Sequence, residues 1–397
     1  MIPPKRGSSN VLCVCNYPSN TGYAWDFIEG LYARVADRLA ERGVTTYVAY
    51  PRIDEPPRPL AGSQAQAVEL DATLWTSASV RATMAFARSH HVRCLYLTDA
   101  PVRDPRYAAL RYAGIRHVLV HDHTSGARSR PEGVRRLIKW GLARVPLISA
   151  DHVVAVSEFV KRRQIDVGLV PSSKVTRVWN GVPVGEPLAP GARPLHDALG
   201  LDRSRPAVVT ACRAAPEKGV PILLRAVDRM LATWPAESPR PVLVYMGDGP
   251  QFAEITRLRE TLASAADIVL TGYRADAGRL VAGADVCAMP SLWEDALPLA
   301  VMQPMAQGLP VVASRVGGIP EMIEDGRTGL LVPAGDVDAL AQALRELVLD
   351  PALRTAMGEA SRRRVAEWFT PAQQIDALTE RALIGLGLDP GPAGPSA

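Results

Sequence analysis

Residues 290–321 read PSLWEDALPLAVMQPMAQGLPVVASRVGGIPE, and the order of elements in this stretch indicates the fold class. The apolar run 286–289 comes directly before it and is typical of a buried parallel strand. Pro298 suits the first position of a helix, and Gly308 suits its end. The apolar residues 310–313 then predict a second strand. Strand, helix and strand in this order are the building block of a parallel α/β sheet.

The loop before this helix combines acidic side chains with free backbone amides. Glu294 and Asp295 are adjacent acids in the loop, and carboxylates suit sugar hydroxyls. The amides of Leu299, Ala300 and Val301 begin the helix, where a backbone N–H has no helical partner and can bind an anion. A phosphate bound beside a sugar describes a sugar nucleotide, which is the ligand that this stretch predicts.

The same stretch resembles the donor-site signature of the retaining glycosyltransferases of family 4, which have the GT-B fold. In that signature a Glu follows Pro-Ser, and seven residues separate it from a second Glu, which precedes Ala-Met-Ala and Gly. Counted back from Gly308, this chain has Asp295 at the first acidic position and Gln303 at the second. The resemblance implies that Gln303 binds the ribose and that Asp295 or Glu294 binds the donor sugar.

Composition is that of an ordinary globular protein with two or three domains in its 397 residues. Apolar residues make up 47% and charged residues 22%, and the net charge of +4 is too small to predict a nucleic-acid partner. No apolar run reaches the roughly 18 residues that predict a membrane-spanning helix. Five cysteines without paired spacing predict buried thiols in a reducing cytoplasm.

Strands and helices alternate through the first half of the chain. Residues 10–15 and 44–50 are predicted strands that flank a helix, which makes a βαβ unit. The turn-rich loop after the first strand contains Gly22, a candidate for substrate binding. Residues 94–97 and 117–120 continue the pattern as strands. The resemblance implies two Rossmann-like domains whose parallel sheets face each other across a cleft.

A histidine follows the predicted strand 117–120, at the carboxyl end where open α/β sheets bind ligands. From the spacing alone, His121-Asp122-His123 is explained equally well as a hydrogen-bonded turn. No third ligand lies nearby for a zinc ion. In the resembled family a His at this strand end faces the donor sugar, which implies a catalytic role for His121, with His123 as the alternate.

Two basic residues follow the first strand of the second half. Arg213 and Lys218 come after the predicted strand 207–212 and beside a helix start, a position that suits a diphosphate. Their spacing matches the diphosphate-binding pair of the resembled family, which implies that both are catalytic. The resemblance also places Gly249 near the nucleotide and the backbone of Arg274 against the nucleobase.

Residues 132–145 are a predicted helix within a basic segment, 128–145. The basic side chains of the segment are Arg128, Arg130, Arg135, Arg136, Lys139 and Arg144. The apolar positions between them predict a face that packs on the core, opposite a solvated basic face. The alternatives are an anionic acceptor or weak contact with an anionic membrane surface.

No metal site is expected. Asp336 and Asp338 resemble the metal-binding Asp-x-Asp of other glycosyltransferases. They lie at a predicted helix start, however, where acids are favoured for structural reasons. We therefore assign both to the helix.

A proline-rich stretch without periodicity, 183–206, predicts the linker between domains. We expect an N-terminal acceptor domain over 1–187 and a C-terminal donor domain over 188–370. In the last segment, 371–397, a helix would return to the first domain before a disordered tail from Asp389.

The resemblance implies metal-independent transfer of a hexose-type sugar, with retention, from a nucleotide diphosphate sugar. We expect a UDP sugar rather than a GDP sugar and no cofactor. The acceptor hydroxyl would belong to a small molecule, a glycan or a lipid-linked acceptor. Two alternatives stay open, namely a sugar-nucleotide epimerase of the same fold and a non-catalytic glycosyltransferase-like partner.

Overall fold

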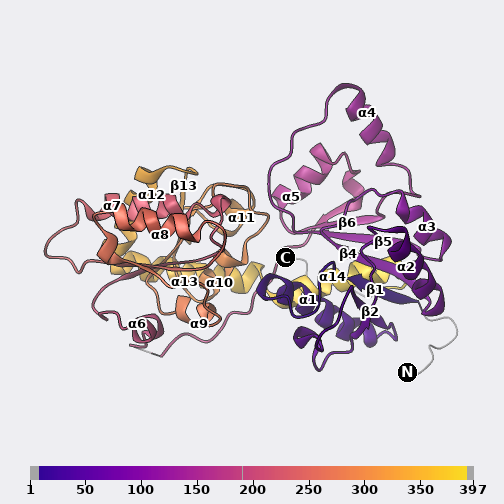
Figure 1. The fold of residues 1–397 in the computed structure, drawn as a ribbon, viewed down its shortest axis with the longest axis horizontal. Helices are drawn as coiled ribbons and strands as arrows, with labels where there is room; N and C mark the ends of the chain where they lie inside the picture. Colours follow the sequence, from indigo (N-terminus) through magenta and orange to yellow (C-terminus); the bar gives the residue numbers. More distant parts are fainter. Residues whose placement is uncertain (1–8, 190, 391–397) are drawn as a thin grey trace. The chain divides into compact units, whose positions relative to one another are not determined.

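The computed structural model describes residues 9–189 and 191–390, apart from the side chains of residues 23 and 24. The chain divides into two compact units (Figure 1). The first takes residues up to Thr124, 128–179 and the segment from Ala372, and the second takes 125–127 and 180–371. The predicted disordered tail falls largely on residues 391–397, which lie outside the described residues.

The first unit is built on a seven-stranded sheet in the order β3-β2-β1-β4-β5-β6-β7. All its strand pairs are parallel. From β1 the chain builds the sheet outward in one direction through β2 and β3, and then in the other direction from β4. The loops that follow β1 and β4 therefore lead away from each other at the carboxyl edge of the sheet. The strands are β1 (Asn10–Val14), β2 (Thr46–Tyr50), β3 (Gln66–Glu69), β4 (Val92–Thr98), β5 (His117–Asp122), β6 (His152–Ala155) and β7 (Val175–Arg177).

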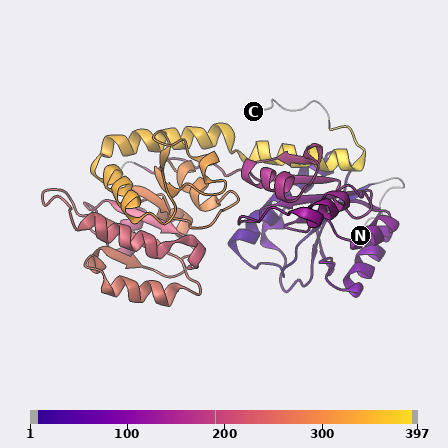
Figure 2. The same cartoon turned by 90° about the horizontal axis from the view of Figure 1, so that it is seen from above.

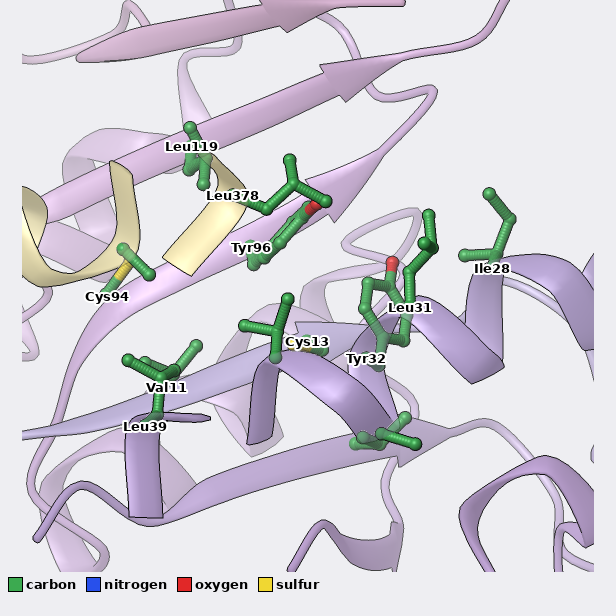
Figure 3. Close-up of a cluster of buried hydrophobic side chains, with 14 of the residues drawn as sticks. Val11, Cys13, Ile28, Leu31, Tyr32, Leu39, Cys94, Tyr96, Leu119 and Leu378 are labelled. Carbon is green, nitrogen blue, oxygen red and sulfur yellow. The ribbon is translucent and has the colours of Figure 1, made fainter. Parts of the chain in front are cut away.

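Helices cover this sheet, and the last helix of the chain joins its core. Tyr32 and Tyr96 pack edge to face, with ring centroids 5.3 Å apart, and Leu378 from the last helix lies in the same cluster (Figure 3). The helices are α1 (Tyr23–Ala40), α2 (Ser77–Ser89), α3 (Arg106–Tyr112), α4 (Gly133–Leu142), α5 (Glu158–Arg162) and α14 (Pro371–Leu386), with a π-helical turn η2 (Arg163–Val167) after α5 and short 3-10 turns at Arg58–Leu60 and Ser172–Lys174.

The second unit is built on a six-stranded parallel sheet in the order β10-β9-β8-β11-β12-β13. Its winding reverses between β8 and β11, the place where open α/β sheets bind ligands. The strands are β8 (Ala207–Ala211), β9 (Val242–Met246), β10 (Ile268–Leu270), β11 (Val286–Met289), β12 (Val311–Ser314) and β13 (Gly329–Val332).

The strands of the second unit lie between two layers of helices (Figure 2). Buried leucines of α7 and α12, among them Leu223 and Leu344, form part of its core. The helices are α6 (Pro194–Leu199), α7 (Val220–Leu231), α8 (Phe252–Thr261), α9 (Ala277–Val281), α10 (Leu299–Ala306), α11 (Ile319–Met322), α12 (Val337–Leu349) and α13 (Pro351–Trp368), with 3-10 turns η4 (Pro216–Lys218) and η5 (Ala265–Asp267).

The predicted α/β class with two parallel sheets is confirmed. β11 has the predicted bounds, whereas α10 begins at Leu299 with Pro298 as its N-cap, one residue later than predicted. Asp336 is the N-cap of α12, and its side chain accepts from the amide of Ala339, as expected. Asp338 lies in the first turn of the same helix and pairs with Arg229.

One prediction about α4 is wrong. Its apolar face was expected to pack on the core, but no residue of α4 is buried. Val134 is 71% exposed and Leu137 69% exposed. In Figure 1 the helix lies at the outer end of its unit, away from the strands. Periodicity identified an amphipathic helix, but it does not say whether protein covers the apolar side. No helix in the described ranges is long and apolar enough to cross a membrane.

Candidate active site

A tight loop after β8 carries the first two predicted site residues. Arg213 lies two residues beyond the end of the strand, and the short 3-10 turn η4 ends at Lys218. Gly219 closes this turn with φ +66°, and a Cβ there would lie 2.0 Å from the carbonyl oxygen of Pro290. A side chain would therefore collide with the backbone, and only glycine allows this approach. The loop thus lies against the segment that follows β11.

Lys218 meets Asp295 across these two loops. The Lys218 Nζ lies 2.7 Å from Asp295 Oδ1, and the Ser291 hydroxyl donates to Asp295 Oδ2 at 2.8 Å. The Asp295 carbonyl accepts from the amide of Gly318 at 2.8 Å, and a Cβ at Gly317 would lie 2.2 Å from the same oxygen. Asp295 is buried. A well-partnered acid therefore fixes the position of the ammonium group.

The N-terminus of α10 lies in the same segment. Pro298 caps it without a side-chain hydrogen bond. The amides of Leu299 and Ala300 have no hydrogen-bond partner in the part of the chain that the structure describes. The amide of Val301, which we expected to be free, donates to the carbonyl of Pro298 at 3.1 Å. Two amides rather than three are therefore available to an anion.

Arg213 is the exposed member of the basic pair. Its side chain is 68% exposed, and its Nη2 lies 3.5 Å from Glu217 Oε1. An exposed pair at this distance is weak, so the guanidinium is accessible to a ligand. Gly249, with φ +149°, lies against this loop, because a Cβ there would be 3.1 Å from Arg213 Cγ and 2.6 Å from the Ala214 carbonyl oxygen. The loops after β8 and β9 are thereby brought together.

Three other predicted residues have different surroundings. Gln303 is half-buried in α10, and its side-chain amide has no partner among the described residues. The Arg274 guanidinium makes two hydrogen bonds of 2.8 Å to Asp276, and the Arg274 carbonyl accepts from the amide of Ala277 at 3.2 Å. The Glu294 carboxylate accepts from the amide of Ala127, one of three residues that cluster with the second unit, at 3.0 Å. Their roles in binding stay predictions.

His121 belongs to the first unit, at the end of β5. It is buried, and its Nδ1 lies 2.8 Å from the Tyr96 hydroxyl oxygen. Burial, and secondarily the nearby His123 ring, hold the pKa of His121 well below its usual value. Burial likewise lowers the pKa of His123 to about 4. Both rings are therefore neutral at pH 7, and the two Nε2 atoms have no hydrogen-bond partner within the described ranges. A neutral imidazole offers a hydrogen bond but no charge.

Comparison with known proteins identifies the family. Residues 205–350 match the family described as Glycosyl transferases group 1, and residues 29–186 match Glycosyltransferase Family 4. The GDP-mannose-dependent alpha-(1-6)-phosphatidylinositol monomannoside mannosyltransferase of Mycolicibacterium smegmatis is 33% identical over 283 residues, 68% of this chain and 71% of that protein. This chain belongs to the group 1 glycosyltransferases.

Two solved structures share the fold of this glycosyltransferase. The glycosyltransferase from Rickettsia africae ESF-5 aligns with a TM-score of 0.78 at 19% identity, over 96% of this chain and 99% of that one. Anabaena Alr3699/HepE in complex with UDP aligns with a TM-score of 0.72 at 17% identity, over 94% of this chain and 99% of that one. The fold is that of the GT-B glycosyltransferases.

One residue that positions Asp295 in this glycosyltransferase was not singled out from sequence. It is Ser291, and its signal was the Pro-Ser pair in residues 290–321. Gly22, which was singled out, is the N-cap of α1 with φ +124°, and its carbonyl accepts from the amide of Trp25. Gly22 therefore has a structural role at the start of that helix, and its contact with substrate stays a prediction.

Proposed function

We propose that this glycosyltransferase moves a hexose-type sugar from a nucleoside diphosphate sugar to an acceptor hydroxyl, with retention of the anomeric configuration. The observation that carries the proposal is the arrangement at the carboxyl ends of β8 and β11. There the Lys218–Asp295 ion pair, at 2.7 Å, shares a segment with the N-terminus of α10. A cation and unpartnered amides suit a diphosphate, and a carboxylate suits sugar hydroxyls.

In the proposed reaction, the bond between the anomeric carbon and the diphosphate oxygen breaks. A bond from that carbon to the acceptor oxygen forms on the same face of the sugar, and the acceptor proton passes to the leaving phosphate. Lys218, Arg213 and the amides of α10 stabilise the charge that develops on the leaving group. In this proposal the chain's own cations do what a metal ion does in other transferases, so the reaction is metal-independent.

The choice of nucleotide is part of the proposal. We propose a UDP sugar, as the resemblance in sequence led us to expect. The mycobacterial relative is named for GDP-mannose, whereas the HepE complex contains UDP. The nucleobase would meet the loop of Arg274 after β10. We also propose a cytoplasmic location, because the chain has five free cysteines.

The acceptor side includes contact with a membrane surface. α4 exposes Val134, Leu137 and Ile138 beside the exposed cations Arg135 and Arg136. Apolar side chains and arginines on one short helix suit an anionic lipid surface. Leu137→Glu should abolish sedimentation with phosphatidylglycerol vesicles and leave folding stability unchanged. Equal sedimentation of the variant and the wild type would exclude α4 from the contact.

Donor turnover tests the function as a whole. The protein is incubated with UDP and GDP sugars, and both the nucleoside diphosphate and the sugar nucleotide are analysed. Release of one diphosphate, slowly to water and faster with an acceptor, is the expected result. Conversion of the donor into an epimer without release would indicate an epimerase instead. Binding without either reaction would indicate a non-catalytic partner.

A further inference from the structure

A cavity lies wholly within the first unit. It has a volume of about 270 Å³. The loop after β4, the end of β5 and the loop that follows it, the turn η2 and one residue of α4 contribute to its walls. Its charged side chains are Asp99, Arg103, Asp122, Arg128, Lys139 and Arg163, and we call it the basic pocket. Four cations against two carboxylates leave an excess of positive charge.

One carboxylate in the basic pocket is already neutralised. Asp122 and Arg163 form a buried ion pair with 3.1 Å between Arg163 Nη2 and Asp122 Oδ2. Gln164 Nε2 and the Thr124 hydroxyl also donate to Asp122. The pKa of Asp122 lies below its usual value, because these hydrogen bonds and Arg163 outweigh the effect of burial. The two charges of this pair therefore neutralise each other, and the pair lines the pocket without adding net charge.

The other three cations have no carboxylate partner in the described part of the chain. Arg103 donates to the carbonyl of Gly168 at 2.6 Å, and Arg128 donates to the Thr124 hydroxyl at 3.2 Å. Lys139 is half-buried, and its side-chain ammonium makes no hydrogen bond or ion pair with the described residues. Burial lowers the pKa of Lys139, and the charges of Arg103 and Arg128 lower it further. The three like charges thus gather without a counter-ion.

Asp99 is the one remaining acid. Its Oδ1 accepts from the amide of His123 at 2.6 Å, and its backbone has φ +55°, a conformation that residues with side chains seldom adopt. Burial raises the pKa of Asp99 to about 6, against the lowering effect of that amide. A single carboxylate, whose charged form is disfavoured by burial, does not balance three cations. The basic pocket is therefore suited to bind an anion.

We propose that the basic pocket binds a phosphate group on the acceptor, as a phosphomonoester or a phosphodiester. Arginine forks and a lysine are the side chains that bind phosphate best. The volume suits one phosphate with a few attached atoms rather than a large ligand. This inference deepens the proposed transferase function and names the chemical class of its acceptor. The phosphate can belong to a soluble molecule or to a lipid headgroup, and α4 connects the pocket to the lipid alternative because Lys139 lies on that helix.

The first experiment measures phosphate binding to the full-length protein by calorimetry, with glycerol 3-phosphate as the probe and glycerol as its uncharged control. Lys139→Gln should weaken binding about tenfold or more, because it removes an unpaired cation from the pocket. Arg136→Gln is the matched control, since it loses the same charge from an exposed position on the same helix. Asp99→Asn should tighten binding. Equal affinities in Lys139→Gln and Arg136→Gln, or no binding of the probe, would overturn the proposal.

The second experiment identifies the source of the phosphate. Vesicles of phosphatidic acid in phosphatidylcholine are compared with phosphatidylcholine alone. A loss of vesicle binding that is larger in Lys139→Gln than in Arg136→Gln assigns the phosphate to a lipid. Equal vesicle binding of the two variants, with the tenfold loss for glycerol 3-phosphate retained, assigns it to a soluble acceptor. UDP titrations on the same variants separate this inference from the proposed function, because nucleotide affinity should stay unchanged in both.

Discussion

Lys218 and Arg213 have the same proposed role but different surroundings. Lys218 is largely enclosed and pairs with buried Asp295, whereas Arg213 projects into solvent. We expect both Lys218→Ala and Arg213→Ala to lower turnover roughly 10²-fold, in line with the loss of one donor to the developing charge. Only Lys218→Ala should also destabilise the fold, since it leaves Asp295 without its counter-ion.

Kinetics and chemical denaturation of the two variants check this contrast. Arg229→Ala is the control, because Arg229 is an exposed residue of the same unit that pairs with Asp338 on the helix surface. Near-normal turnover in both site variants would remove them from the diphosphate site. A stability loss in Arg213→Ala as large as that in Lys218→Ala would contradict the assigned surroundings.

Gln303 tests the ribose assignment. Its half-buried side chain has no partner among the described residues, so its carbonyl oxygen is free to accept from a ribose hydroxyl. Gln303→Ala should weaken nucleoside diphosphate binding by about 0.5–1.5 kcal/mol, the net value of a typical hydrogen bond. Gln303→Glu should tighten it or leave it unchanged. Calorimetry that finds no change in Gln303→Ala, with the protein folded, would show that this residue only packs in its helix.

The residue types of the donor site could be predicted from sequence, but their pairing could not. Asp295 was placed beside a donor sugar and Lys218 beside a diphosphate, each through its own motif. The bond between them joins positions 77 residues apart, and it depends on the close backbone approach at Gly219. The burial of His121 could not be predicted from sequence either, because only the folded chain shows that this histidine is enclosed and neutral.

Among the helices and strands, α10 has the proposed role that can be tested most simply, namely binding of the diphosphate by the amides at its N-terminus. Leu299→Pro removes one free amide at the position where proline fits a helix best. Leu299→Ala is the matched control, because it shortens the side chain and keeps the N–H. We expect Leu299→Pro to bind a nucleoside diphosphate about tenfold more weakly than Leu299→Ala, since a hydrogen bond to a charged group contributes about 1.5–3 kcal/mol. Equal affinities in a titration would show that this amide does not face the diphosphate.

The sequence pattern predicted an element correctly where the apolar residues of that element are also buried in the folded chain. The apolar run of β11 marks a strand buried on both faces, and its bounds were predicted correctly. α4 is the opposite case, because its periodicity is as clear and yet nothing in the described chain covers its apolar side. The basic pocket was also beyond prediction, since its cations come from the loop after β5 and from three further segments that only the fold assembles.

For the whole molecule, we predict activity without a metal ion. In our proposal, Lys218, Arg213 and the N-terminus of α10 supply the positive charge at the diphosphate. Asp336 caps α12, and Asp338 pairs with Arg229 of α7. Donor turnover should therefore persist after dialysis against EDTA. Loss of activity on chelation, with recovery on addition of magnesium or manganese, would contradict this prediction.

Because we propose the donor role for the second unit and the acceptor role for the first, variants in each unit can test the two roles separately. The measurement is a calorimetric titration of UDP, and of GDP, into the wild type and into Lys218→Ala and Lys139→Gln. We expect one nucleotide site per chain, with UDP affinity lowered about tenfold or more in Lys218→Ala and unchanged in Lys139→Gln. The absence of binding by either nucleotide, or equal affinity in the wild type and Lys218→Ala, would contradict the claim that the second unit holds a nucleotide sugar donor.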